Sequence, residues 1–304
     1  MQVASKKKSR LDQDGSRLGD AMIILAMIVV CFVTIYPLYY VFILSISEPI
    51  YASTLRVYVL PKGLFFDTYK IIMRTNLLWR SYLNTIIYVV AQTGLTLLTS
   101  VLAGYVLTNK RFAGRKLVTV FLLIPMYFGG GMIPTYLLIA KLGLLNTYSA
   151  LILPGAYSIW YIILTRTFFL SIPEEVRESA RMDGANNFTT LFRIYLPLSK
   201  PIMAVIGIYC IVGVWNSWFS SNIYQSNEKI QPLQMFLRRV LVEQTVDMSK
   251  GMTADEAAMA AQKRLTSNQL KYAMIVFSTL PVLVVYPFLQ KYFVKGVMLG
   301  SLKG

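Results

Sequence analysis

The chain has 304 residues, of which 56% are hydrophobic and 14% are charged, and it contains no histidine. Soluble globular proteins carry about 25% charged residues, so the composition excludes an ordinary soluble domain and indicates a membrane protein. The absence of histidine also excludes histidine-based metal sites and Ser-His-Asp triads within this chain.

Six apolar stretches without Asp, Glu, Lys or Arg follow one another along the chain. Because a helix needs about 20 apolar residues to cross the hydrocarbon core of a bilayer, each stretch predicts one membrane-spanning helix. The sequence therefore predicts an all-α membrane protein with six transmembrane helices, preceded by a polar N-terminal tail, residues 1–20. The predicted spans are residues 21–47, 81–108, 117–140, 142–165, 201–227 and 272–290.

The distribution of basic residues predicts the orientation. The short turn after the second span carries Lys110, Arg111, Arg115 and Lys116, whereas the turn after the third carries only Lys141. Since basic residues are enriched in cytoplasmic loops near the ends of spans, both termini are expected in the cytoplasm. Topology and contact with anionic lipid headgroups then explain the net charge of +16 better than nucleic-acid binding does.

The third span is interrupted by Pro125, by the glycines 129–131 and by Pro134. Such residues are tolerated in a membrane helix only where neighbouring groups or a water-filled cavity satisfy the freed backbone. The pattern predicts either a packing kink or an unwound lining of the translocation path, to which Gly130 and Gly131 would contribute.

The fifth span contains a Trp-Asn-Ser-Trp run. Tryptophan is enriched at membrane interfaces, whereas a buried amide must find hydrogen-bond partners. The run is therefore either an interfacial belt or, through Trp215, Asn216 and Trp218, part of the translocation path. The external loop that follows, residues 228–271, is expected to be helical over 235–243. It predicts either a solvated cap or a docking surface for a solute-binding protein.

The most informative segment is the charged loop 171–199, between the fourth and fifth spans. Its first residues have the form of a capping box, with Ser171 as the N-cap and Glu174 three residues later, so a helix is expected to start there. Gly184 predicts the end of that helix, because glycine tolerates the left-handed conformation. A second short helix is expected over 187–195.

This loop resembles the signature of the permeases of ABC importers, which reads E-A-A, three residues, G, nine residues, I-x-L-P. Six positions match at the family's offsets, and Ser179 replaces the usual alanine. The resemblance implies that the loop is a cytoplasmic coupling element that binds an ATPase. The small side chains of Ala180 and Ala185 would keep this element narrow enough to enter a groove of that subunit. The residues assigned to this contact are Glu178, Ser179, Ala180, Asp183, Gly184, Ala185, Ile194, Leu196 and Pro197.

Other segments narrow the family. Residues 166–169, 196–201 and 290–296 resemble sugar-uptake permeases related to the maltose system, and residues 126–134 resemble the subgroup linked to complex oligosaccharides. The resemblance implies a type I importer permease of the bacterial plasma membrane. Its expected partners are a second, non-identical permease, two ATPase subunits and an extracellular solute-binding protein that delivers the sugar.

The chain lacks the phosphate-binding sequence G-x-x-x-x-G-K-[ST]. ATP and Mg²⁺ are therefore expected on the ATPase subunits, and no catalytic residue, metal site or cofactor is expected on this chain.

Two alternatives stay open. An ABC permease for peptides or amino acids would carry the same signature loop, and the specificity of its binding protein would distinguish it. An ion-coupled secondary transporter would need charged residues within its spans, and the predicted spans contain none.

Overall fold

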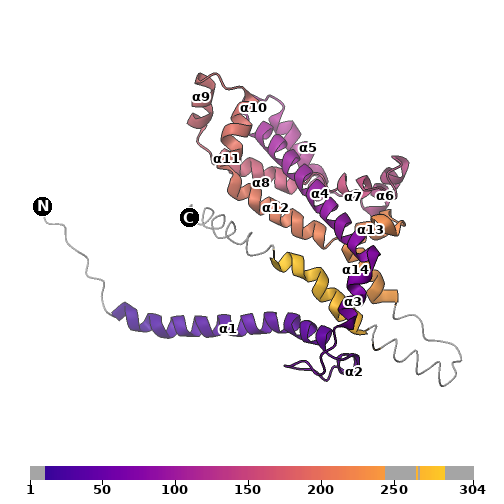
Figure 1. Ribbon diagram of the computed structural model, residues 1–304. Coiled ribbons are helices and arrows are strands. Elements are labelled where there is room, and N and C mark those ends of the chain that lie inside the picture. The colour runs from indigo at the N-terminus through magenta and orange to yellow at the C-terminus, as the bar shows by residue number, and fades with distance from the viewer. Residues whose placement is uncertain (1–10, 244–264, 266–267, 285–304) are drawn as a thin grey trace. The chain divides into compact units, whose positions relative to one another are not determined.

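The computed structural model describes residues 11–243, 265 and 268–284, and every regular element in these ranges is a helix (Figure 1). The predicted all-α class is therefore confirmed. The start of the N-terminal tail, most of the external loop after residue 243 and the end of the sixth span lie outside the described residues. The chain divides into two units, Met1–Ile71 with Lys250–Val276 and Ile72–Ser249 with Phe277–Gly304.

The first unit begins with a long helix, α1, which starts within the predicted N-terminal tail rather than after it. Its part Gly19–Ile46 is long and apolar enough to cross a bilayer. After α1, the fully buried Gln269 donates from Nε2 to the Ser47 carbonyl (2.6 Å) and accepts at Oε1 from the Thr68 hydroxyl (2.7 Å). These bonds satisfy a buried amide. The helices that begin in this unit are α1 (Leu11–Ile46), α2 (Pro49–Ser53) and α3 (Asp67–Arg74).

The second unit is organised around α4 (Asn76–Thr108), which is 33 residues long and apolar enough to cross a bilayer. Both α8 (Ile159–Leu170) and α12 (Lys200–Trp215) pack against it (Figure 1). Helix association in a bilayer depends on close packing through small residues. At Gly104, an added Cβ would lie 2.9 Å from the side chain of Thr165 on α8, so a larger residue would force these helices apart.

Three predicted spans are not continuous helices. The third is divided into α5 and α6, which are bent by 111° where the glycine run interrupts the helix. In the fourth, α7 ends shortly before Pro154, whose ring lacks the N–H that a continuing helix needs, and α8 follows. The fifth stops at Trp215 and is followed by α13. These elements are α5 (Arg115–Tyr127), α6 (Met132–Lys141), α7 (Ser149–Ile152) and α13 (Phe219–Tyr224).

The six predicted spans therefore stay a prediction, and the interruption predicted in the third span is confirmed. Two helices in this part of the chain can span a bilayer alone, and the number rises to four if each bent pair is one span. The second bent pair consists of Asn187–Leu198 and α12, which meet at 78°. Broken helices are compatible with a membrane where protein or water satisfies the freed backbone groups.

Different elements lie at the two ends of α4 (Figure 1). At the Thr108 end lies the loop 171–199, which is called the signature loop below. At the Asn76 end lie η2 and α14, and α14 confirms the helix expected at the start of the external loop. The elements are α9 (Glu174–Met182), α10 (Asn187–Thr189), the π-helical turn η1 (Thr190–Tyr195), α11 (Leu196–Leu198), the 3-10 turn η2 (Glu228–Ile230) and α14 (Leu233–Glu243).

Candidate functional site

The signature loop contains a tight turn between α9 and α10. Gly184 has φ +78°, a left-handed conformation that glycine adopts without steric cost. Its N–H bonds to the Arg181 carbonyl (3.0 Å), and the N–H of Ala185 bonds to the Ala180 carbonyl (2.9 Å). These bonds satisfy carbonyls that the end of α9 leaves free. The predicted end of the first helix at Gly184 is confirmed.

The start of α9 differs from the predicted capping box. Pro173 occupies the N-cap position, and the Ser171 hydroxyl donates instead to the Phe168 carbonyl (2.7 Å), so no side chain caps the helix. Glu174 and Glu175 lie in the first turn, where negative charge stabilises the positive end of a helix.

The second helix of the loop is also longer than predicted. It runs without a break from α10 through η1 to the end of α11 at Leu198. Pro197 does not end it, because the helix continues from the π-helical turn η1 through this residue to Leu198. Ile194 and Leu196 pack against the buried cluster of Val101, Tyr105, Phe169, Leu191 and Tyr195, and Pro197 is exposed.

One face of α9 is packed against the rest of the unit. The guanidinium of Arg177, which is 6% exposed, lies 5.0 Å from the ring centroid of Tyr105 and 5.2 Å from that of Tyr195. Its Nη2 also donates to the hydroxyl of Thr108 (3.0 Å). The contact with Tyr105 and the bond to Thr108 thus hold α9 against the end of α4, and the contact with Tyr195 holds it against η1.

We expect Arg177→Ala to lower the free energy needed to detach α9 from the rest of the unit by about 2 kcal/mol. The substitution removes both cation–π contacts and the bond to Thr108. Arg177→Met keeps most of the packing between the two rings and should lose less. Chymotryptic cleavage after the exposed Phe188 measures this loosening in the purified protein. Equal cleavage rates for the wild type and the alanine variant would contradict the prediction.

A second link joins the signature loop to the turn after α4. The Lys110 ammonium donates a hydrogen bond to Glu174 Oε2. This bond, together with the positive charge of Lys110, holds the pKa of the Glu174 carboxyl below its usual value. Both side chains are largely exposed, so water screens the pair and its contribution to stability is small.

The opposite face of the loop is exposed and carries two large apolar side chains on either side of the Gly184 turn. Met182 is 88% exposed and Phe188 is 71% exposed. Neither was singled out in the sequence, although an apolar residue at the tip of a charged loop is itself a signal of a covered surface. Of the residues assigned to the ATPase contact, Glu178, Ser179, Asp183 and Gly184 share this exposed face, and Ala185 is half-buried.

Ala180 lies on the inner face. It is 5% exposed, so its side chain packs within this chain and does not project toward a partner. The assignment of Ala180 to the ATPase contact stays a prediction, and within this chain its side chain faces inward. The reason is helical geometry: Ala180 follows the anchored Arg177 by three residues, and residues three apart lie on the same face of a helix.

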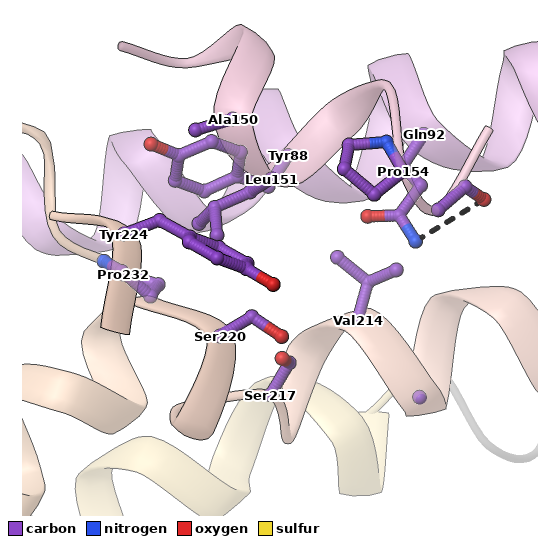
Figure 2. Close-up of a pocket in the computed structure, with 12 residues that line it drawn as sticks. Tyr88, Gln92, Ala150, Leu151, Pro154, Val214, Ser217, Ser220, Tyr224 and Pro232 are labelled. Carbon is purple, nitrogen blue, oxygen red and sulfur yellow. Dashed lines mark hydrogen bonds between the residues drawn. The ribbon is translucent and has the colours of Figure 1, made fainter. Parts of the chain in front are cut away.

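A cavity of about 290 Å³ lies within the second unit (Figure 2). It is bordered by α4, by the segment around α7 and by the residues that join α12 to α13. Tyr88 and Gln92 line it from α4, Pro154 and Gly155 from the segment after α7, and Ser217 from the break after α12. The cavity thus lies where the fourth and fifth predicted spans are interrupted.

Side chains of α4 bind the unwound backbone at this cavity. The Gln92 amide and the Thr96 hydroxyl both donate to the Gly155 carbonyl, at 3.4 Å and 3.0 Å. The Thr99 hydroxyl donates to the Ala156 carbonyl (2.9 Å). An added Cβ at Gly155 would lie 2.0 Å from the Gln92 amide nitrogen, so a larger residue here would displace the Gln92 side chain from this position. The freed carbonyls are thereby satisfied inside the protein.

A buried polar network joins α4 to the segment before α14. The Tyr88 hydroxyl donates to the Ile230 carbonyl (2.8 Å) and accepts from the Gln225 amide (2.7 Å). The Asn84 amide donates to the Gln231 carbonyl (3.1 Å) and accepts from the Tyr148 hydroxyl (2.7 Å). Fully paired networks of this kind fix one arrangement of the groups around them.

The residues predicted for the translocation path lie outside the lining of this cavity. Trp215 is 7% exposed and donates to the Ser278 carbonyl (3.3 Å), and the Asn216 amide donates to the preceding turn of its own helix. The guanidinium of Arg238 covers the ring of Trp218, with its Cζ atom 4.5 Å from the ring centroid. Gly130 and Gly131 lie at the bend between α5 and α6, where an added Cβ would meet nothing within 4 Å.

The sequence did contain a signal for the cavity. Gly213, Ser217 and Ser220 line it, and small residues that recur in an apolar span indicate either close helix packing or open space beside the helix.

Comparison with known proteins decides the family. The family described as "Binding-protein-dependent transport system inner membrane component" matches residues 71–221, which contain α4, the signature loop and most of the cavity lining. Protein LplC of Bacillus subtilis (strain 168) is 38% identical over 90% of each chain. The chain belongs to this family of permeases.

Two further comparisons support the assignment. The permease is 34% identical to the polygalacturonan/rhamnogalacturonan transport system permease protein YtcP of Bacillus subtilis (strain 168), over 95% of this chain and 99% of the relative. It also resembles the crystal structure of a bacterial ABC transporter involved in the import of the acidic polysaccharide alginate. That match has a TM-score of 0.81 and 32% identity, and it covers 95% of this chain and 100% of the other. The predicted resemblance to ABC-importer permeases is confirmed, and the permease is a membrane protein.

Proposed function

We propose that this permease forms half of the translocation path of an ATP-driven importer for an oligosaccharide. The observation that carries the proposal is the structure of the signature loop. Its inner face is anchored to the permease by Arg177, and its outer face presents exposed apolar side chains around a glycine turn. Exposed apolar side chains in this position do not stabilise the permease alone. A soluble ATPase that covered them would bury them, and this burial would stabilise the complex.

The other subunits follow from the same arrangement. A second, non-identical permease would complete the path, and an extracellular binding protein would deliver the substrate. Two ATPase subunits would hold ATP and Mg²⁺ and grip one signature loop from each permease, so that ATP-driven closure and reopening alternate access to the two sides. This chain would supply the path and no catalytic group.

We place both termini and the signature loop in the cytoplasm. The Lys110–Glu174 contact supports this orientation, because it brings the basic turn after α4 to the same end of the unit as the signature loop. Basic turns are enriched on the cytoplasmic side, which is where the ATPases must bind.

A carbohydrate substrate is favoured by the relatives, since YtcP is named for polygalacturonan and rhamnogalacturonan transport and the solved relative takes part in alginate import. The cavity supports the same class, because hydroxyl and amide side chains line it. Oligomers of sugars present the matching hydroxyl groups.

The test is uptake by the complete complex in proteoliposomes, with its binding protein outside and ATP inside. Tritiated maltotriose, arabinotriose and trigalacturonate are compared with a tripeptide. Uptake of at least one trisaccharide that needs both ATP and the binding protein is expected. Uptake of the tripeptide alone, or uptake driven by an ion gradient without ATP, would overturn the proposal.

A further inference from the structure

We propose that the cavity between α4, α7 and the α12–α13 junction binds one uncharged sugar ring of the transported oligosaccharide. The inference rests on the proposed function and assigns substrate contact to this permease, in addition to any contact made by its partner. The size of the cavity fits this role. Ligand pockets measure about 300–1,000 Å³, so a cavity of about 290 Å³ suits one ring rather than a whole oligosaccharide.

Neutral hydrogen-bonding groups converge in the cavity. Figure 2 shows the hydroxyls of Ser217, Ser220 and Tyr224 directed toward the same part of it, opposite the Gln92 amide. Within the described part of the chain, no hydrogen bond engages the hydroxyls of these two serines. A hydroxyl both donates and accepts hydrogen bonds, so the two serines can bind sugar hydroxyls that act as donors or as acceptors.

An aromatic surface accompanies these hydroxyls. The Tyr224 ring lines the cavity, and stacking on the Tyr136 ring holds it in place. The two ring centroids are 6.3 Å apart and the angle between the ring planes is 16°. Ligand sites commonly combine such a rigid apolar surface with a few convergent polar groups. The apolar C–H face of a sugar ring matches the first feature, and its hydroxyl rim matches the second.

The electrostatics of the lining select an uncharged ring. No Asp, Glu, Lys or Arg is among the described residues that line the cavity. A carboxylate placed here would lose its water without gaining a cationic partner, which costs free energy. An acidic sugar unit is therefore excluded from this cavity, and any carboxylates of the substrate would be held elsewhere along the path.

Gly213 indicates that the space is needed rather than left by poor packing. Glycine within a helix is about 1 kcal/mol less favourable than alanine. An added Cβ at Gly213 would meet nothing within 4 Å, so no neighbouring atom requires glycine there. The residue lines the cavity, and a larger side chain would occupy the space assigned to the sugar.

The experiment fills that space. Gly213→Leu is compared with Gly94→Leu, which makes the same change on α4 at a position where an added Cβ also meets nothing and which does not line the cavity. In the complete complex, uptake of maltotriose or arabinotriose should fall about tenfold or more in Gly213→Leu and stay near the wild-type rate in Gly94→Leu. ATP hydrolysis stimulated by the loaded binding protein should persist in Gly213→Leu, because the ATPase contact is untouched.

A second variant guards against misfolding of the first. Ser217→Ala combined with Ser220→Ala removes two hydroxyls without adding bulk, and it should raise the KM for the neutral trisaccharide about tenfold with little change in kcat. Normal uptake kinetics in this double variant would overturn the inference, as would wild-type uptake by Gly213→Leu. A wild type that imports only trigalacturonate would also overturn it and leave the proposed function intact. A wild type that imports no trisaccharide would instead refute the proposed function.

Discussion

Gly184→Val is expected to abolish uptake by the reconstituted importer while the permease still inserts into the membrane. The cause lies in the backbone, since φ is +78° at this position and an added Cβ has no neighbour within 4 Å. Forcing a β-branched residue into this conformation costs about 1–3 kcal/mol, which the turn can relieve only by changing its shape. Met182 and Phe188 lie on either side of the turn, so their relative placement would change.

Three measurements check this expectation. The amount of ATPase that co-purifies with the permease and the rate of sugar uptake should both fall about tenfold or more. The yield of membrane-inserted permease should match the wild type. Gly184→Asn is the matched control, because asparagine adopts the left-handed conformation more readily than other residues with a side chain. Wild-type uptake by the valine variant would rule out the role assigned to this turn.

Charged substitutions of the exposed side chains of Met182 and Phe188 are expected to weaken binding of the ATPase strongly. Met182→Asp and Phe188→Asp place a charge where the ATPase is proposed to bury an apolar side chain. A central interface residue of this kind contributes about 2 kcal/mol or more, so affinity for the ATPase should fall roughly thirtyfold for each variant. Both side chains are exposed in the permease alone, so its own folding should be unaffected.

The matched controls are Met182→Leu and Phe188→Leu, which keep an apolar side chain at each position. They should retain most of the affinity, as measured by titrating purified ATPase into permease reconstituted in nanodiscs. Equal affinities for the aspartate and leucine variants would show that the ATPase does not cover this pair.

The sequence predicted the parts of the structure that depend on local pattern. The apolar run predicted the end of α4 at Thr108, although the helix starts five residues before the predicted span, and the conformational freedom of glycine predicted the turn at Gly184. The spacing of the signature loop predicted the family. Each of these features depends on residues close together in the chain, so no tertiary contact was needed to infer it.

Features that depend on tertiary packing were not predictable in the same way. Arg177 looked like one more charge on a polar loop, and its burial between Tyr105 and Tyr195 became visible only when the two rings were placed. The inward direction of Ala180 depends on that same anchor. The cavity likewise requires interruptions in two separate spans to meet beside Gln92, which hydropathy, averaged along one segment at a time, does not reveal.

The helix α12 has a mechanical consequence for the proposed transport cycle. It begins directly after the signature loop, runs as one helix from Lys200 to Trp215, and carries Gly213 in the wall of the cavity. A helix of 16 residues is a stiff rod about 24 Å long, so it tilts as a whole rather than absorbing a displacement. A displacement of the Lys200 end by the ATPase subunits would therefore move the Trp215 end beside the cavity. The breaks at Ser199 and Asn216 would act as the hinges for this tilt.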